Sequence, residues 1–552
     1  MPLGLALLVM LLASACSGSG TAASSAQSGP ALAEIDATRL DAHLRFLSHD
    51  LLEGRAPSTR GGQLAAEYLA TQLALLGFAP GASDGTYFQQ VGIVESVVDP
   101  SFTLRVGAGA PFRYLQDVVA FSAKQGADVR TDGEVVFVGY GIVAPEYRWN
   151  DYDGIDMADK VALIMVNDPP ATADEPQLFG GDALTYYGRW TYKLEEAARQ
   201  GAAGALLIHT DESATYPWQV VQTSWSGTQY SLPVEPGQPV LGMKAWVSNA
   251  AAMEIARRAG KDLEALRTAA RARGAKPVPL GIRASATIAQ TVVRRTTPNV
   301  IGVLGGKDSS RAVLYTAHYD HFGIRAARPD DPPGADRIFN GAIDNASGVA
   351  GVLTIAQAFA RADAPPAHSV YVMFTTAEES GLLGAEFFAR QPVLPAGRWL
   401  ANINVDGLNL AGRTHDVVLL GAERSTLGPV AEALAKNHGR VIGPDPEPGR
   451  GHFYRSDHFP LAKAGVPALS LGDPREYLGR DPSFAKRIRD QYNDTDYHQP
   501  TDDYRTTWDL SGAIEDMRLL AELGWTIANG PDVPTYHPAE QFARPRQAAG
   551  TH

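Results

Sequence analysis

One stretch constrains this chain more than any other: residues 369–388 hold an apolar run, a pair of adjacent glutamates and a helical pattern. Residues 369–374 are typical of a buried strand, and residues 382–388 have the spacing of a helix. Glu378 and Glu379 lie between them. At an extended strand end, neighbouring side chains point to opposite sides, so one glutamate can hold a metal while the other moves a proton. The pair also suits the first turn of a solvated helix, where acids favour the helix dipole.

Residue types that ligate metals recur where other predicted strands end. His318 and Asp320 close one apolar run, and Asp406 closes another. Asp344 precedes an apolar helix, and His498 lies in a polar loop. Open α/β sheets place their binding sites at the carboxyl ends of strands, so we expect these groups to converge. A mixture of histidines and carboxylates suits zinc, with cobalt or manganese as alternatives.

The ordered motifs His-x-Asp, Asp-Asn-x-Ser-Gly, Glu-Glu, Asp and Tyr-His resemble the dizinc aminopeptidases of peptidase family M28. The resemblance spans residues 44–529. It implies an α/β protein with a three-layer, mixed-sheet zinc-exopeptidase fold. It also implies a metallo-aminopeptidase whose substrates are peptides with a free N-terminus.

The resemblance assigns ligands to two Zn²⁺ ions, for which Co²⁺ or Mn²⁺ could substitute. Asp344 would bridge the two ions through its two oxygens. His318 and Asp406 would complete one site. Glu379 and His498 would complete the other.

Further roles follow at neighbouring positions. By the same resemblance Glu378 would be the general base that takes a proton from the attacking water and delivers it to the leaving amine. Asp320 is suited to hold the second ring nitrogen of His318 and so to fix its tautomer. Tyr454, in a loop before Ser-Asp-His, would donate a hydrogen bond to the oxyanion. Other residues are expected to orient loops or substrate or to be structural: His321, His452, His458, Asp502 and Asp503.

The sequence pattern changes at residues 118–298. Short β-rich runs appear there, and the segment contains none of the ligand motifs. Residues 138–142 and 197–204 resemble the protease-associated (PA) domain, which implies an inserted β-rich PA domain. The catalytic domain is then expected in two pieces, with a polar tail of no visible role at the end of the chain. These segments are residues 31–117 and 299–530 for the catalytic domain and 531–552 for the tail.

The first residues suit an export signal. An apolar stretch within residues 1–16 is too short to span a membrane, and Cys16 follows Ala-Ser-Ala as in a bacterial lipoprotein cleavage site. We expect an exported protein, periplasmic or anchored in the outer membrane through a lipid on Cys16, with plain secretion as the alternative. Residues 17–30, rich in Ser, Gly and Ala, are expected to form a flexible linker.

Composition and motifs reduce the number of partners and functions that the sequence allows. The net charge of −13 argues against a nucleic-acid partner, and contact with a membrane is expected only through Cys16. A carboxypeptidase or dipeptidase on the same scaffold and a glutaminyl cyclase with one zinc remain open. A receptor-like member without catalysis is disfavoured, since every ligand position and Glu378 are present. Ser83 lies in a literal G-x-S-x-G with no helix after it, which predicts a turn and not a nucleophile elbow.

Overall fold

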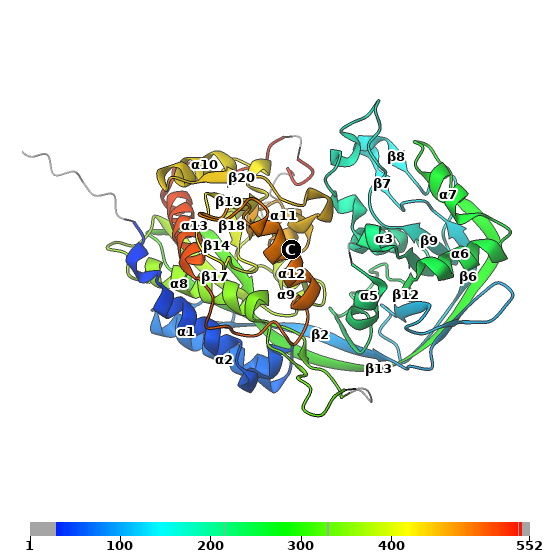
Figure 1. Ribbon diagram of the computed structural model, residues 1–552, viewed down its shortest axis with the longest axis horizontal. Helices are drawn as coiled ribbons and strands as arrows, with labels where there is room; N and C mark the ends of the chain where they lie inside the picture. The colour runs from blue at the N-terminus through cyan, green and yellow to red at the C-terminus, as the bar shows by residue number, and fades with distance from the viewer. Residues whose placement is uncertain (1–28, 215, 328–330, 539, 544–552) are drawn as a thin grey trace, which may run out of the picture.

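The structure is a computed structural model that describes residues 29–214, 216–327, 331–538 and 540–543. Figure 1 shows two lobes side by side, joined along one edge by β2 (Phe88–Val98) and β13 (Val278–Leu304). These two strands pair antiparallel from Phe88 opposite Val300 to Val98 opposite Gln290. The predicted signal, Cys16 and residues 17–28 of the predicted linker lie outside the described residues.

The first lobe is built on a mixed sheet in the order β2–β13–β17–β14–β18–β21–β19–β20. Neighbours from β17 to β21 are parallel, so their carboxyl ends meet at one edge of the sheet. These strands are almost continuously apolar because helices cover both faces. The bounds are β1 (Ala79–Pro80, beside β13), β14 (Asp308–His318), β17 (His368–Thr375), β18 (Trp399–Asn404), β19 (Asp416–Leu420), β20 (Val441–Gly443) and β21 (Ala468–Gly472).

Helices form the two outer layers, which confirms the expected three-layer α/β fold. One face packs against α1 (Ala37–Leu47), α2 (Arg60–Leu75), α8 (Gly348–Ala360), α10 (Leu427–Asn437) and α13 (Ser511–Asn529). The other face packs against α9 (Leu383–Arg390) and α11 (His458–Lys463). Helix α12 (Phe484–Thr495) leads into the segment that carries His498.

Helix α8 follows the predicted ligand Asp344 and anchors it to the core. Its sequence, GVAGVLTIAQAFA, is apolar on nearly every side, as expected of a helix buried all round. At Gly351 a Cβ atom would come 2.6 Å from the sulfur of Met517 on α13. Glycine therefore fits this close approach of the two helices, and a larger residue would require the Met517 side chain to move.

The second lobe has hydrophobic cores of its own on the two faces of a sheet ordered β5–β12–β10–β9–β6–β13–β3. Along β10, Leu206 and Ile208 join one core while Ala205 and Leu207 join the other. The bounds of the sheet strands are β3 (Thr103–Val106), β5 (Val118–Phe121), β6 (Asp128–Phe137), β9 (Lys160–Met165), β10 (Gly204–Ile208) and β12 (Met243–Val247). The helices are α3 (Trp190–Arg199), α4 (Asp211–Ala214), α5 (Trp218–Ser224), α6 (Asn249–Arg258) and α7 (Leu263–Ala270).

The lobe boundary differs from the one expected at residue 118. The second core already includes Val98, Phe102 and Leu104, because β3 pairs with β13 and packs into that core. Helices from this lobe contribute to both cores, so the insertion is less purely β than its sequence suggested. Short strands complete the chain: β4 (Phe112–Arg113), β7 (Val143–Ala144), β8 (Trp149–Asn150), β11 (Thr228–Ser231), β15 (Gly323–Ile324) and β16 (Ile338–Phe339).

Ser83 lies in the predicted turn, between β1 and β2, and a strand follows it where a nucleophile elbow requires a helix. Within the described residues, every helix is too short or too polar to cross a membrane.

The described part of the C-terminal tail packs on the first lobe, so the prediction of a tail with no visible role is wrong for these residues. Tyr536 and Phe542 are 8% and 7% exposed. The Tyr536 hydroxyl donates to the Val466 carbonyl at 2.9 Å, and Glu540 pairs with Arg424 at 2.9 Å. The sequence concealed this role because two aromatic residues carry the contact within a polar stretch.

Replacing Phe542 with alanine should lower the free energy of unfolding by about 3 kcal/mol, since its ring is buried against Phe453 and Phe459. Leu75→Ala is the matched control, because Leu75 is 72% exposed and should change stability by less than about 0.5 kcal/mol. Denaturant unfolding of both variants checks the prediction. Equal stability of the two would mean that the tail does not pack.

Candidate metal centre

The predicted ligands gather at the carboxyl edge of the parallel strands. His318 is the last residue of β14, and Asp406 lies two residues after the end of β18. Glu379 lies in the turn after β17. Asp344 lies in the turn Ala342–Ser347 that leads into α8, and His498 follows α12. The parallel strand order therefore brings together residues that are far apart in the sequence.

Asp344 lies at the middle of the cluster. Its Oδ1 is 3.1 Å from Nε2 of His318, and its Oδ2 is 3.2 Å from Nε2 of His498. One carboxylate thus faces two histidines through two different oxygens.

Each histidine has a second carboxylate beside it. Nε2 of His318 is 3.1 Å from Oδ1 of Asp406, and Nε2 of His498 is 3.2 Å from Oε2 of Glu379. The cluster therefore has two halves, each with one histidine, one carboxylate of its own and a share of Asp344.

Glu378 and Glu379 face different neighbours, although the backbone between them is not an extended strand end. Strand β17 stops at Thr375, Ala377 has a φ of 55°, and the Glu378 carbonyl accepts hydrogen bonds from the next turn. Glu378 groups with His318 and Asp406, their donor atoms lying within 4.8 Å of one another. Glu379 instead lies 2.5 Å from Nδ1 of His321.

Asp320 supports the centre through atoms other than those expected. Its carboxylate Oδ1 is 4.0 Å from Nδ1 of His318, too far for a hydrogen bond, whereas its main-chain carbonyl is 3.2 Å from that nitrogen. The carboxylate accepts the backbone N–H of Glu378 at 3.1 Å. Asp320 thus contacts His318 through its backbone and fixes Glu378 through its side chain.

Tyr454 packs in an aromatic core, and its expected oxyanion role stays a prediction. The hydroxyl accepts a hydrogen bond from Arg424 at 3.2 Å. Its ring packs among Phe453, Phe459 and Tyr186, and Tyr454 is only 5% exposed. The turn His452–Tyr454 directs this side chain into an aromatic core, an orientation that the loop sequence does not reveal.

Two residues beside the predicted ligands hold the ligand backbone in place. The carboxylate of Asp502 accepts the backbone N–H groups of Ile343 and Asp344 at 3.0 and 3.1 Å. The side chain of Asn345 donates to the Val405 carbonyl at 2.9 Å and accepts from Gly407 at 2.8 Å. Because Val405 and Gly407 flank Asp406, Asn345 ties the Asp344 turn to the Asp406 loop.

Sequence reasoning gave Tyr497 no role of its own. Its ring stacks on His498, with ring centroids 3.7 Å apart, yet it is 42% exposed. Its position directly before a predicted ligand was the available signal.

Arg55 is buried beneath the centre and was also missed. Its guanidinium donates to the carbonyls of Tyr319, Asn340 and Gly341 at 2.8, 2.6 and 3.0 Å, and also to that of Leu47. One cation thereby joins the loops that precede Asp344 and follow His318.

Burial and crowding set the protonation of the cluster. Burial raises the pKa of Glu378 well above its usual value, with Asp406 and Glu379 adding to the rise against the pull of His318. Burial would lower the pKa of His318, but Glu378 and Asp406 raise it well above its usual value. Burial would raise the pKa of Asp344, yet hydrogen bonds from both histidines hold it well below. Packed carboxylates of this kind favour a positive charge among them.

The donor set fits metal ions such as zinc. Two ligands of a tetrahedral zinc with bonds of about 2.0–2.1 Å lie about 3.3 Å apart. The contacts of Asp344, Asp406 and Glu379 with the two histidines, at 3.1–3.2 Å, are close to this spacing. Imidazole nitrogens and carboxylate oxygens are also the ligand types that zinc accepts.

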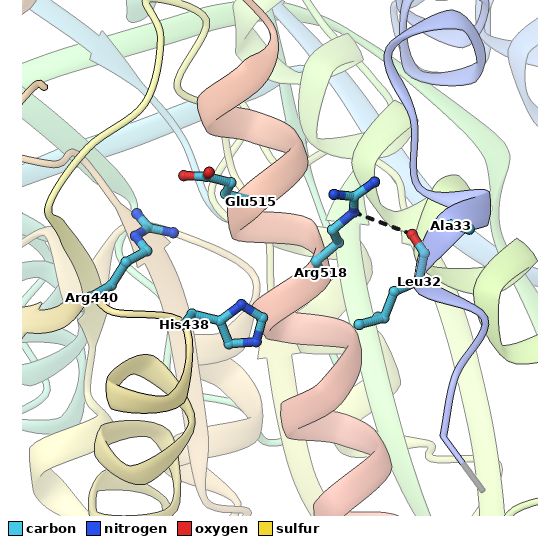
Figure 2. Close-up of a pocket in the computed structure, with 6 residues that line it drawn as sticks. All are labelled: Leu32, Ala33, His438, Arg440, Glu515 and Arg518. Atoms are coloured by element: carbon cyan, nitrogen blue, oxygen red, sulfur yellow. Dashed lines mark hydrogen bonds between the residues drawn. The ribbon is translucent and has the colours of Figure 1, made fainter. Parts of the chain in front are cut away.

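A separate cavity of about 460 Å³ shares no residue with the centre (Figure 2). Its basic groups are engaged by the protein itself: Arg518 donates to the Leu32 carbonyl at 3.2 Å, and Arg440 pairs with Asp516 at 2.7 Å. The residues of this cavity therefore take no part in the candidate metal centre.

Fold and donor set together define a candidate metal centre on an α/β scaffold, and part of the chain is similar to known proteins. Residues 299–521 match the model of peptidase family M28. The matched segment contains each of the predicted ligands.

Curated relatives match part of the chain. A protein named probable zinc metalloprotease from Pyrenophora teres f. teres (strain 0-1) is 28% identical over 251 residues, which are 42% of this chain and 48% of that protein. Leupeptin-inactivating enzyme 1 from Streptomyces exfoliatus is 26% identical over 201 residues, 36% of this chain and 44% of that protein. The chain thus spans about half the length of the curated relatives it matches.

Among solved structures, an aminopeptidase from Aneurinibacillus sp. strain AM-1 superposes with a TM-score of 0.52 at 17% identity. The match covers 92% of this chain and 98% of that one. At this identity the likeness shows a shared fold.

Replacing Arg55 with alanine should lower the free energy of unfolding by about 3–5 kcal/mol, because it leaves several buried carbonyls without a donor. Arg60→Ala is the control, since Arg60 is 71% exposed and its pairing with Glu53 is worth at most about 1 kcal/mol. Chemical unfolding of the two variants measures the difference. A loss for Arg55→Ala no larger than that for Arg60→Ala would contradict the buried role.

Proposed function

We propose that the protein is a zinc-dependent exopeptidase that carries two Zn²⁺ ions and acts as an aminopeptidase. The observation that carries the proposal is the position of Asp344, which presents one oxygen to His318 and the other to His498. In this proposal His318, Asp344 and Asp406 hold one ion. Asp344, Glu379 and His498 hold the other.

The proposed chemistry divides between the metal ions and the protein. Bound zinc ions lower the pKa of a water molecule and stabilise negative charge that develops on the substrate carbonyl oxygen. Glu378 would accept the proton from the attacking water and return it to the leaving amine. Asp320 fixes Glu378 for this task through the Glu378 backbone N–H, and His321 orients Glu379.

The aminopeptidase assignment draws on the relatives as well as on the site. The Aneurinibacillus protein with the same fold is named an aminopeptidase, and the Pyrenophora protein is named a probable zinc metalloprotease. The substrates that we propose are peptides with a free N-terminus. We further propose that the protein is exported, with Cys16 as a lipid anchor, and that the second lobe is a PA domain; both ideas rest on sequence alone.

Hydrolysis of leucine nitroanilide beside its N-acetylated twin tests the activity. Zinc-loaded protein should cleave the free form alone, a chelator should abolish cleavage, and added zinc should restore it. Metal analysis should find two zinc ions per chain. Two metals without cleavage of either substrate would favour a carboxypeptidase or dipeptidase, and one zinc would favour a glutaminyl cyclase.

Glu378→Gln should retain zinc but lose about 10²- to 10⁴-fold in kcat, because a general base contributes that much. The control is Glu423→Gln, since Glu423 is 70% exposed and is not among the residues of the cluster. Steady-state kinetics on variants of known zinc content give the comparison. Full activity in zinc-replete Glu378→Gln would remove Glu378 from the mechanism.

A further inference from the structure

The two histidines of the cluster are held in different ways. Nδ1 of His318 lies 3.2 Å from the main-chain carbonyl of Asp320, a contact that fixes the ring. Among the described residues, the polar side-chain contacts of His498 run through Nε2, to Asp344 and Glu379. The second ring nitrogen, which usually anchors a metal-binding histidine, therefore does not fix His498 to this part of the chain.

Two aromatic rings contact His498 instead. The ring of Tyr497 stacks on it, with ring centroids 3.7 Å apart and planes 28° apart. The ring of Phe322 meets it at a steep angle of 61°, with centroids 4.7 Å apart. Aromatic contacts of these kinds have preferred geometries, so they favour one orientation of the imidazole. The segment after α12 and the loop after β14 thus both hold this ring.

Each of the two rings is itself supported. Phe322 directly precedes β15 and packs on Phe339 of β16, with ring centroids 5.9 Å apart. Tyr497 packs on Tyr492 of α12, with centroids 6.0 Å apart. The Tyr492 hydroxyl donates to the carboxylate of Asp502 at 3.3 Å. This carboxylate also holds the backbone of the shared ligand, so the support of the two ligands is connected.

The backbone of His498 also requires support from its surroundings. Its φ is 57°, in the left-handed region that residues with a side chain adopt uncommonly. Such a conformation persists where the contacts around it determine it. His321, the residue before Phe322, lies 2.5 Å from Glu379. Two neighbouring residues of one loop therefore contact the two ligands that only this half of the cluster uses.

We propose that Phe322 and Tyr497 are positioning residues that hold His498 for the zinc ion of this half. The inference deepens the proposed function and rests on its two-zinc centre. The aromatic ring of Tyr497 is the part required, since the ring makes the contact with the imidazole. Tyr497 is 42% exposed, so its ring can be removed without opening the core of the lobe.

Zinc titration of the metal-free, full-length protein in competition with a chelator measures both zinc affinities and requires no peptidase activity. Tyr497→Ala and Phe322→Ala should each weaken one zinc ion about 10- to 100-fold and leave the other unchanged, since residues that orient a ligand contribute that much to metal affinity. Tyr497→Phe should keep the affinity of the unaltered protein, because it retains the ring. Phe46→Ala is the matched control, since Phe46 lies on α1 and is 44% exposed.

Zinc affinities that neither alanine variant changes would overturn the proposal, as would an equal loss for both zinc ions. A loss for Tyr497→Phe as large as that for Tyr497→Ala would also overturn it, because the hydroxyl and not the ring would then be responsible. Phe322 is partly buried, and its replacement carries the greater risk of misfolding. The exposed Tyr497 and its two variants decide the question in that case.

Failure of the proposed function gives a different result from failure of the positioning role. If the unaltered protein binds two zinc ions without cleaving leucine nitroanilide, the aminopeptidase fails while the zinc titrations still test Phe322 and Tyr497. Unchanged zinc affinities in an active enzyme would contradict the positioning role alone. If the protein binds one zinc ion, a loss of its affinity in Tyr497→Ala would support the positioning role and an unchanged affinity would overturn it. A protein that binds no zinc would overturn both.

Discussion

The shared carboxylate of Asp344 is the constraint on which the rest of this site depends. It must face two histidines that come from the end of β14 and from the segment after α12. That position holds only because Asp502 binds the backbone N–H of Asp344 and Asn345 fastens the same turn to the loop of Asp406. Helix α8, buried on nearly every side, then fixes the turn to the core. A small displacement of this turn would separate both halves of the cluster at once.

The charges of the centre are balanced over several layers of the fold. Several carboxylates lie close together at the edge of the sheet. Arg55 is buried near them, and its guanidinium donates hydrogen bonds to backbone carbonyls. Arg55 therefore supplies positive potential and joins the loops without competing as an ion-pair partner of the ligands. This separation of tasks leaves the carboxylate oxygens of Asp344, Glu379 and Asp406 directed at the histidines.

The two lobes are coupled more closely than an insertion between two boundaries suggests. Strand β13 belongs to both sheets, and β11 of the second lobe pairs with β2. Tyr230 and Leu232 of that lobe pack with Ala377 and Leu383, on either side of the glutamate pair. The second lobe thus borders the loop of Glu378, and Leu184 and Tyr186 also contact Pro448 and Phe459 of the first lobe. The C-terminal tail adds a third support, since Tyr536 and Phe542 close the aromatic cluster that holds Tyr454.

The sequence by itself determined the α/β class, the segments that carry the ligand types and their convergence, because strand-end placement is local and parallel strands share one edge. It also predicted an inserted domain from the change to short β-rich runs after residue 118. Only the tertiary structure decided which atoms meet. Asp320 contacts His318 through its carbonyl, Tyr454 hydrogen-bonds with Arg424, and Arg55 donates to carbonyls hundreds of residues away. Side-chain direction in a loop depends on what packs around it, and no local pattern records that packing.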